Sequence, residues 1–134
     1  ITMWHVLEHV SDLNGRLEQL ATLLKPKGYL IIAVPNCNAY DAKIYGQFWA
    51  GYDLPRHLYH FTKEDIKLLL ERHGFTIVNI LPMKFDAFYV SLLSEKYMSG
   101  KMRWLPALWN GFWSNIKSGQ KNGYSSQIYV IKMK

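Results

Sequence analysis

The chain has 134 residues, which fits one domain or a large piece of one. Hydrophobic residues make up 49% and charged residues 19%, so a buried core is expected and disorder is not. No run of about eighteen apolar residues could cross a membrane, and the single cysteine excludes an intrachain disulfide. The net charge of +6 comes from basic residues spread along the chain, so we expect weak attraction to anionic surfaces and no nucleic-acid partner.

The first elements are a strand and a helix. Residues 1–4 have the pattern of the end of a buried strand. Ser11 or Asp12 can cap the helix that follows, because a short side-chain oxygen accepts hydrogen bonds from the free N–H groups of the first turn. One face of this helix carries Leu13, Leu17, Leu20 and Leu24. The residues Lys-Pro-Lys-Gly at 25–28 then end the helix.

The middle of the chain contains two further strands and a helix. Residues 29–34 form a continuous apolar run, which is typical of a parallel strand covered on both faces. The stretch 35–61 is rich in aromatic residues and glycine, and we expect a long loop there. Thr62 and Asp65 form a capping-box signal for a second helix, and residues 75–81 predict the next strand.

The last third of the chain, residues 83–124, differs in character. Its apolar residues recur at helical spacing in two groups, which predicts two helices. The groups are Phe85, Phe88, Tyr89, Leu92 and Leu93, and then Leu105, Leu108, Trp109, Phe112 and Ile116. A polar linker at 119–123 precedes a last strand at 126–132. The alternation of strands and helices along the chain predicts an α/β layered fold.

Several short patterns occur together in this sequence. They are WHVLEHVSD at 4–12, GYLIIAVPN at 28–36, FW at 48–49, PRHL at 55–58, HFT at 60–62 and GF at 74–75. In combination they resemble the class I S-adenosylmethionine-dependent methyltransferases, and in particular a bacterial subgroup near the ubiquinone-type O-methyltransferases. The resemblance covers residues 1–81 and extends to the last strand.

The resemblance implies a Rossmann-like fold with a seven-stranded sheet, of which residues 1–134 are the carboxyl-terminal part and 83–124 a helical insert. In that family a glycine-rich loop follows the first strand, and acidic residues at the second and third strands contact the ribose and adenine. None of these precedes Ile1, so we expect a truncated domain that is inactive alone. The implied function of the whole protein is methyl transfer from S-adenosylmethionine to an oxygen of a small molecule, in the cytoplasm.

The resemblance also implies where the cofactor and the catalytic groups lie. His5 follows the first strand with Trp4 beside it, so this pair is predicted to form a wall of the cofactor pocket. An oxygen acceptor needs a base, and histidine is the usual base near neutral pH. We therefore predict catalytic roles for His57, His60 and His9. The alternative is that these residues cap and pack the neighbouring elements.

Three further positions are predicted to bind the substrate. They are Asn36, Trp49 and Arg56, with the guanidinium of Arg56 as an anchor for an acidic group. A turn after the strand would account for Asn36 equally well. His5, Glu8 and His9 offer two imidazoles and a carboxylate on a short turn. Their spacing matches no recognised metal site, so no metal is expected.

A different class of function is a non-catalytic binding module. Eight aromatic residues lie between Phe85 and Trp113, and the stretch 83–124 has six lysine or arginine residues against two acidic ones. This composition suits peripheral contact with a membrane, contact with a partner, or a lid over an apolar substrate. The alternative is a helical cap that buries its apolar stripe against the sheet.

Overall fold

The computed structural model describes residues 1–119 and 123–134, and the described strands form one sheet. Its order is β1-β2-β4-β3. β1 pairs with β2 in parallel, whereas β4 is antiparallel to both β2 and β3. The strands are β1 (Thr2–Trp4), β2 (Leu30–Pro35), β3 (Phe75–Pro82) and β4 (Ser126–Met133). The predicted α/β fold is confirmed.

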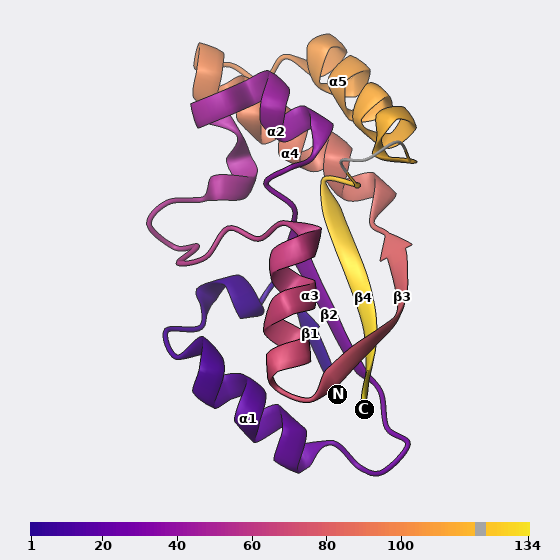
Figure 1. Cartoon of the computed structure of the whole chain (residues 1–134). Coiled ribbons are helices and arrows are strands. Elements are labelled where there is room, and N and C mark those ends of the chain that lie inside the picture. Colours follow the sequence, from indigo (N-terminus) through magenta and orange to yellow (C-terminus); the bar gives the residue numbers. More distant parts are fainter. Residues whose placement is uncertain (120–122) are drawn as a thin grey trace.

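Five α-helices accompany the sheet in the described part of the chain. They are α1 (Leu13–Leu23), α2 (Tyr40–Tyr45), α3 (Lys63–Arg72), α4 (Lys84–Ser99) and α5 (Trp104–Lys117). α1 and α3 lie along the sheet, while α2, α4 and α5 gather at the end where β2 and β3 finish (Figure 1). Both chain termini lie at the opposite end (Figure 1). No described helix is long and apolar enough to cross a membrane.

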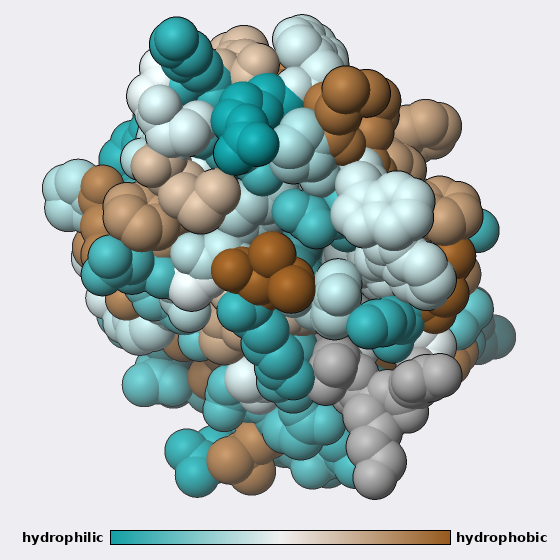
Figure 2. Space-filling model, turned by 90° about the horizontal axis from the view of Figure 1, so that it is seen from above, coloured by the Kyte–Doolittle hydropathy of each residue, from teal (hydrophilic) through white to brown (hydrophobic). Residues whose placement is uncertain are grey.

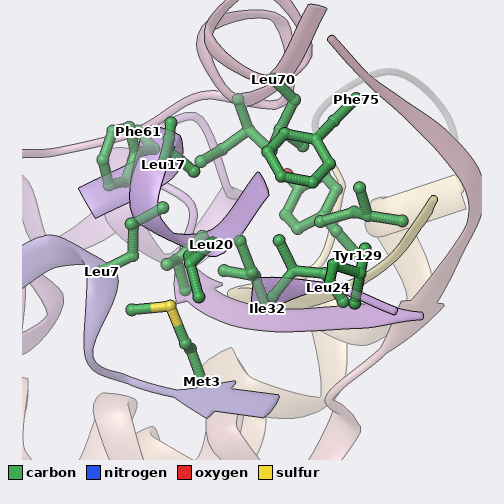
Figure 3. Packing of buried hydrophobic residues seen from close by; sticks show 14 residues of the cluster. Met3, Leu7, Leu17, Leu20, Leu24, Ile32, Phe61, Leu70, Phe75 and Tyr129 are labelled. Atoms are coloured by element: carbon green, nitrogen blue, oxygen red, sulfur yellow. The ribbon is translucent and has the colours of Figure 1, made fainter. Parts of the chain in front are cut away.

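The main hydrophobic core lies between one face of the sheet and the helices α1 and α3. Leu17 and Leu20 of α1 and Leu70 of α3 pack there with Ile32 of β2 and Tyr129 of β4 (Figure 3). The predicted leucine stripe of the first helix therefore faces the core, as amphipathic spacing requires.

The two helix starts in this layer are fixed by the predicted side chains. Asp12 caps α1, since its carboxylate accepts a hydrogen bond from the backbone N–H of Gly15 at 2.9 Å. Thr62 and Asp65 form a complete capping box at α3, in which each side chain bonds the other residue's backbone N–H. Both predictions of a cap are confirmed.

Two predictions for the middle of the chain need correction. The strand predicted at 29–34 as part of a parallel sheet is parallel only to β1 and antiparallel to β4, and on its face opposite the core Ile31 is partly exposed whereas Ala33 is buried. The stretch 35–61, predicted as a loop too long to be a plain connector, contains α2 and two 3-10 turns at 46–48 and 50–52. These short elements bury Ala42, Tyr45 and Trp49 in a second apolar cluster.

The insert forms the two predicted helices, α4 and α5. However, α5 does not bury its apolar stripe, as a helical cap would. Its predicted stripe is on the surface, and Leu105 is 82% exposed. The small residues Ala107, Gly111 and Ser114 are buried instead. They allow the two helix backbones to approach, since a Cβ at Gly111 would lie 2.7 Å from the ring of Phe88 on α4. Of the predicted linker, residues 120–122 lie outside the described part.

Candidate active site

The candidate site is a cavity at the end of the sheet where β1 and β2 finish. Its volume is about 220 Å³. His5 directly after β1 and Pro35 at the end of β2 line it, the segment after α2 contributes Gly51, Asp53, Arg56 and His57, and α4 contributes Asp86, Tyr89 and Tyr97. Because carboxyl ends of parallel strands are the usual ligand sites of α/β sheets, this position favours a binding function.

His5 and Glu8 form a polar pair at the end of the sheet where the cavity lies. His5 has a positive φ of 50°, which turns the chain directly after β1 into the short helical turn Leu7–His9. Its Nδ1 lies 3.2 Å from Oε1 of the fully buried Glu8. This hydrogen bond raises the pKa of His5 above its ordinary value, although burial acts in the opposite direction. The other nitrogen, Nε2, lies 3.9 Å from a carboxylate oxygen of Asp86.

His57 sits beside this pair and is only 9% exposed. Its Nδ1 lies 2.9 Å from the carbonyl oxygen of Gly51, so this nitrogen carries the proton. Its Nε2 then faces Oε1 of Glu8 at 3.9 Å and Oδ2 of Asp53 at 3.8 Å. Asp53 also binds Arg56 through a 2.5 Å hydrogen bond. Nε2 of His57 thus lies between two carboxylates at the cavity wall.

His9 completes a cluster with Glu8 and His57. Its ring meets that of His57 edge-on, with 4.6 Å between the centroids, and its Nδ1 lies 2.9 Å from the carbonyl oxygen of Arg56. The backbone joins the same two segments, because the N–H of Leu58 donates to the carbonyl of Glu8 at 2.8 Å. One ligand atom from each of Glu8, His9 and His57 lies within 4.8 Å of the other two.

The residues predicted for the site fall into two groups. His5, Arg56 and His57 line the cavity, and His9 touches it through His57. The other four are elsewhere: Trp4, Asn36, Trp49 and His60. Trp4 is 50% exposed on the sheet face opposite the core. The exposed His60 instead holds the carbonyl oxygen of Tyr52 through Nε2 at 2.9 Å.

Asn36 and Trp49 are buried and do not line the cavity. A polar side-chain group that leaves water needs a hydrogen-bond partner, and both residues have one. The amide nitrogen of Asn36 donates to the carbonyl of Tyr124 at 3.0 Å. The indole N–H of Trp49 donates to the buried carboxylate of Asp41 at 2.8 Å. Both side chains therefore hold the segments behind the site together.

Several cavity residues were not predicted from the sequence. Asp86, Tyr89 and Tyr97 all come from α4, and their separations of three and eight residues place them on one helix face. The sequence contains this helical spacing, but the more numerous aromatic residues of the same segment make it hard to distinguish. Asp53 had no signal, since it reaches the cavity only through the fold of the 35–61 stretch.

Comparison with known proteins identifies the family. A family model described as "Methyltransferase domain" matches residues 1–80, which is more than half of the chain. No curated protein has a sequence that matches this chain. Solved structures match it at low sequence identity, and their likeness concerns the fold alone.

Three solved structures illustrate the fold. The small RNA methyltransferase HEN1 has 15% identity over 99% of this chain and 14% of its own length, with a TM-score of 0.57. The mycolic acid cyclopropane synthase CmaA1, complexed with SAH and CTAB, has 10% identity over 98% and 54%, with a TM-score of 0.57. A SAM dependent methyltransferase from Archaeoglobus fulgidus has 20% identity over 99% and 57%, with a TM-score of 0.53.

This chain thus spans between 14% and 57% of the length of these three proteins. Its sheet and helices have the Rossmann-like methyltransferase fold, as the resemblance implied. The chain belongs to the methyltransferase domain family.

Proposed function

We propose that this chain forms the acceptor-binding part of an S-adenosylmethionine-dependent methyltransferase that methylates an oxygen of a small molecule. The observation that carries this proposal is the cavity at the carboxyl ends of β1 and β2, where histidines face tyrosines. Members of the family use this end of the sheet for the methyl donor. A cavity that combines aromatic walls with a few convergent polar groups suits a small aromatic acceptor.

The cavity fits an acceptor better than it fits a whole nucleoside cofactor. Ligand pockets commonly measure about 300–1,000 Å³, and this cavity has about 220 Å³. In the family the adenosine is held by a glycine-rich loop and two acidic residues, and no such loop occurs in the 134 residues. We therefore propose that this chain alone binds the cofactor weakly and is inactive without those elements. Trp4 is half exposed on the face of the sheet opposite the core, where such a segment could pack.

The chemistry assigned to the chain is positioning and proton removal. When bound, S-adenosylmethionine supplies a methyl group on a sulfonium sulfur. His5 lines the cavity, and its Nδ1–H is fixed by Glu8. Its Nε2 is buried 3.9 Å from a carboxylate oxygen of Asp86 and has no hydrogen-bond partner among the described residues, so we assign it to take the proton of an acceptor hydroxyl that reaches it. The deprotonated acceptor oxygen would then be positioned to take this methyl group, and the bonding electrons between carbon and sulfur would remain with sulfur. His60 has no part in this step.

The acceptor is proposed to be an aromatic acid that carries a hydroxyl. Arg56 stands at the cavity rim and is held by Asp53, so its exposed guanidinium can meet a carboxylate. Tyr89 and Tyr97 line the cavity from α4. Asn36 and Trp49 support the segments behind the cavity and do not contact the acceptor.

The test uses the whole protein encoded by the gene, with a dihydroxybenzoate as acceptor. His5→Gln should lower kcat by about 10²–10⁴-fold, which is the usual contribution of a general base, while S-adenosylhomocysteine still binds. His73→Gln is the matched control, because His73 lies at the end of α3, where its Nδ1 bonds the carbonyl of Leu69. An unchanged kcat in His5→Gln would reject the assigned base. No transfer to any hydroxylated acceptor would reject the function.

A second candidate function is contact with an anionic lipid surface through residues 83–124. Phe85 is 88% exposed, and the apolar stripe of α5 also lies on the surface. Seen from above that end of the molecule, brown apolar side chains stand among hydrophilic ones (Figure 2). Together with an excess of basic residues, this surface suits an interfacial helix.

The lipid contact is tested with vesicles that contain phosphatidylserine. The protein should sediment with them, its tryptophan fluorescence should shift to the blue, and Leu105→Ser should weaken both effects because Leu105 is among the most exposed residues of the stripe. Tyr29→Ser is a control on an exposed apolar residue outside the insert. Absence of sedimentation and of a shift at low salt would reject this candidate.

A further inference from the structure

Asp86 is held in place at the wall of the cavity. It lies in the first turn of α4, and its side chain is 15% exposed. The hydroxyl of Ser126 donates a hydrogen bond to its Oδ2, and the backbone N–H of Met83 donates to the carbonyl of Ser126 at 3.3 Å. Both bonds connect the start of α4 to β4. The carboxylate therefore has a fixed position in the cavity, although no step of the proposed reaction uses it so far.

The same carboxylate faces the unpartnered nitrogen of His5. Nε2 of His5 is buried and has no hydrogen-bond partner among the described residues. Oδ2 of Asp86 lies 3.9 Å from it, which is beyond hydrogen-bond length but close enough for opposite charges to attract. On the other side of the ring, Nδ1 lies 3.2 Å from Oε1 of Glu8. His5 thus lies between two carboxylates that come from different elements, the turn after β1 and the helix α4.

The other titratable groups that line the cavity come from two elements. The segment after α2 supplies Asp53, Arg56 and His57, and α4 supplies Tyr89 and Tyr97, whereas Pro35 of β2 is uncharged. The cation of Arg56 is paired with Asp53, and the described ion-pair contacts of His5 are both with carboxylates. The surroundings of His5 therefore favour a positive charge on its ring.

We propose that Asp86 is a positioning residue, which stabilises the imidazolium of His5 when His5 removes a proton from the acceptor; this use of Asp86 rests on the proposed function. The O–H bond of the acceptor hydroxyl breaks, its electron pair stays on the oxygen, and the proton binds Nε2. The ring thereby changes from neutral to singly positive. Glu8 fixes the proton on Nδ1 beforehand, and Asp86 attracts the new proton on Nε2. That proton leaves to water after the methyl transfer.

The two carboxylates also set the pH range in which His5 can act as a base. The hydrogen bond to Glu8 is the main cause that raises the pKa of His5; burial opposes it, and the charge of Asp86 adds to the rise. A base works only in its unprotonated form, so the rate should increase as the pH rises through this pKa. Removing the charge of Asp86 lowers the pKa of His5. The acidic limb of the rate profile should then move to lower pH, while the less stable imidazolium lowers kcat on the plateau.

The test is a pH titration of the five histidines of this chain by NMR, which needs neither cofactor nor acceptor. The signal of His5 is the one that is missing from His5→Gln. In Asp86→Asn the midpoint of His5 should fall by about one pH unit, because an opposite charge within about 4–6 Å moves a pKa by about 1–3 and this site is partly exposed. Asn has the same shape as Asp, and its amide oxygen can still accept from Ser126. Glu64→Gln is the matched control: it removes one negative charge from the first turn of another helix, α3, and should leave the midpoint of His5 unchanged.

The proposal is overturned if His5 titrates in Asp86→Asn as it does in the unaltered chain, while the unchanged signals of the other histidines show an intact fold. In the whole protein, the acidic limb of kcat should move to lower pH in Asp86→Asn, and kcat on the plateau should fall by up to about tenfold, since one pH unit is a factor of ten in imidazolium stability. A limb that stays in place overturns the use of Asp86 in the reaction. Absence of transfer to any hydroxylated acceptor rejects the proposed function, whereas the titration of His5 does not depend on transfer, so the two failures are distinguishable.

Discussion

At the residue scale, one buried carboxylate links separate parts of the chain near the cavity by hydrogen bonds. Asp41 of α2 is fully buried. It accepts hydrogen bonds from the indole N–H of Trp49 at 2.8 Å and from the hydroxyls of Ser114 and Ser125 at 2.7 Å each. These donors come from the segment before the cavity, from α5 and from the residue before β4. Asp41 thus joins three separate parts of the chain.

Replacing Asp41 by Asn should destabilise the protein. The neutral amide accepts only at its oxygen, so its NH2 would meet the Ser114 hydroxyl, which would have to turn and accept, and the charge of the acceptor is lost. Hydrogen bonds to charged groups contribute about 1.5–3 kcal/mol, so we expect the free energy of unfolding to fall by about 2 kcal/mol in urea denaturation. Asp12→Asn is the control, because Asn caps a helix as well as Asp does. Equal stability of the two variants would contradict the role of Asp41.

Also at this scale, the sequence could not reveal which histidines share a site. The pattern around Glu8 pointed to the right turn, and His57 was recognised as a candidate. Their proximity, however, depends on how the 35–61 stretch returns to that turn through the bond between Leu58 and Glu8. Trp49 was assigned to the substrate from the family resemblance, whereas its burial and its hydrogen bond to Asp41 depend on the fold of that stretch.

At the scale of elements, the apolar stripe marks the buried face of the helix in α1 but not in α5. In α1 the leucine stripe is the apolar face, and Leu17 and Leu20 enter the core. In α5 the large apolar residues lie outside, while the small residues Ala107, Gly111 and Ser114 are buried. Gly111 lies against Phe88 of α4, and Ser114 bonds Asp41 of α2. Helical periodicity predicted both helices, but it could not predict the buried face of α5. Close packing of two helices selects small residues where their backbones approach.

Gly111→Ala tests this packing of α5 against α4. An added Cβ would lie 2.7 Å from the ring of Phe88 and 3.2 Å from the carbonyl oxygen of Ala87. Although Ala favours helices over Gly, overpacking commonly costs about 1–3 kcal/mol, so we expect a lower midpoint of thermal unfolding. Gly119→Ala is the control, since no atom lies within 4 Å of that Cβ. A Gly111→Ala variant as stable as the parent would show that the helices do not pack closely there.

At the scale of the whole molecule, the two faces of the sheet are unequal. α1 and α3 bury one face. The other carries Trp4, Ile31 and Val130, which remain half or partly exposed. β1 pairs only with β2 among the described strands, so its second edge is open. An open edge next to an exposed apolar face is a surface on which further strands and helices can pack.

The exposed sheet face and the open edge of β1 agree with the proposal that this chain binds the acceptor while further elements bind the methyl donor. The fold and the order of the elements could be predicted from capping signals, apolar runs and the family resemblance, because those depend on local sequence. The cavity could not, since it is built from the strand ends, the 46–57 segment and α4 together. The proposed consequence is that the chain holds the acceptor side and depends on further elements for the methyl donor.

The proposed dependence on further elements is tested most directly by calorimetric titration with S-adenosylhomocysteine of this chain and of the whole protein encoded by its gene, side by side. We expect saturable binding by the whole protein and much weaker binding by this chain. Failure of the whole protein to bind would contradict the methyltransferase function. Equal affinity of the two would show that the cofactor contacts lie within these 134 residues, and would contradict the proposed division between acceptor and donor sides.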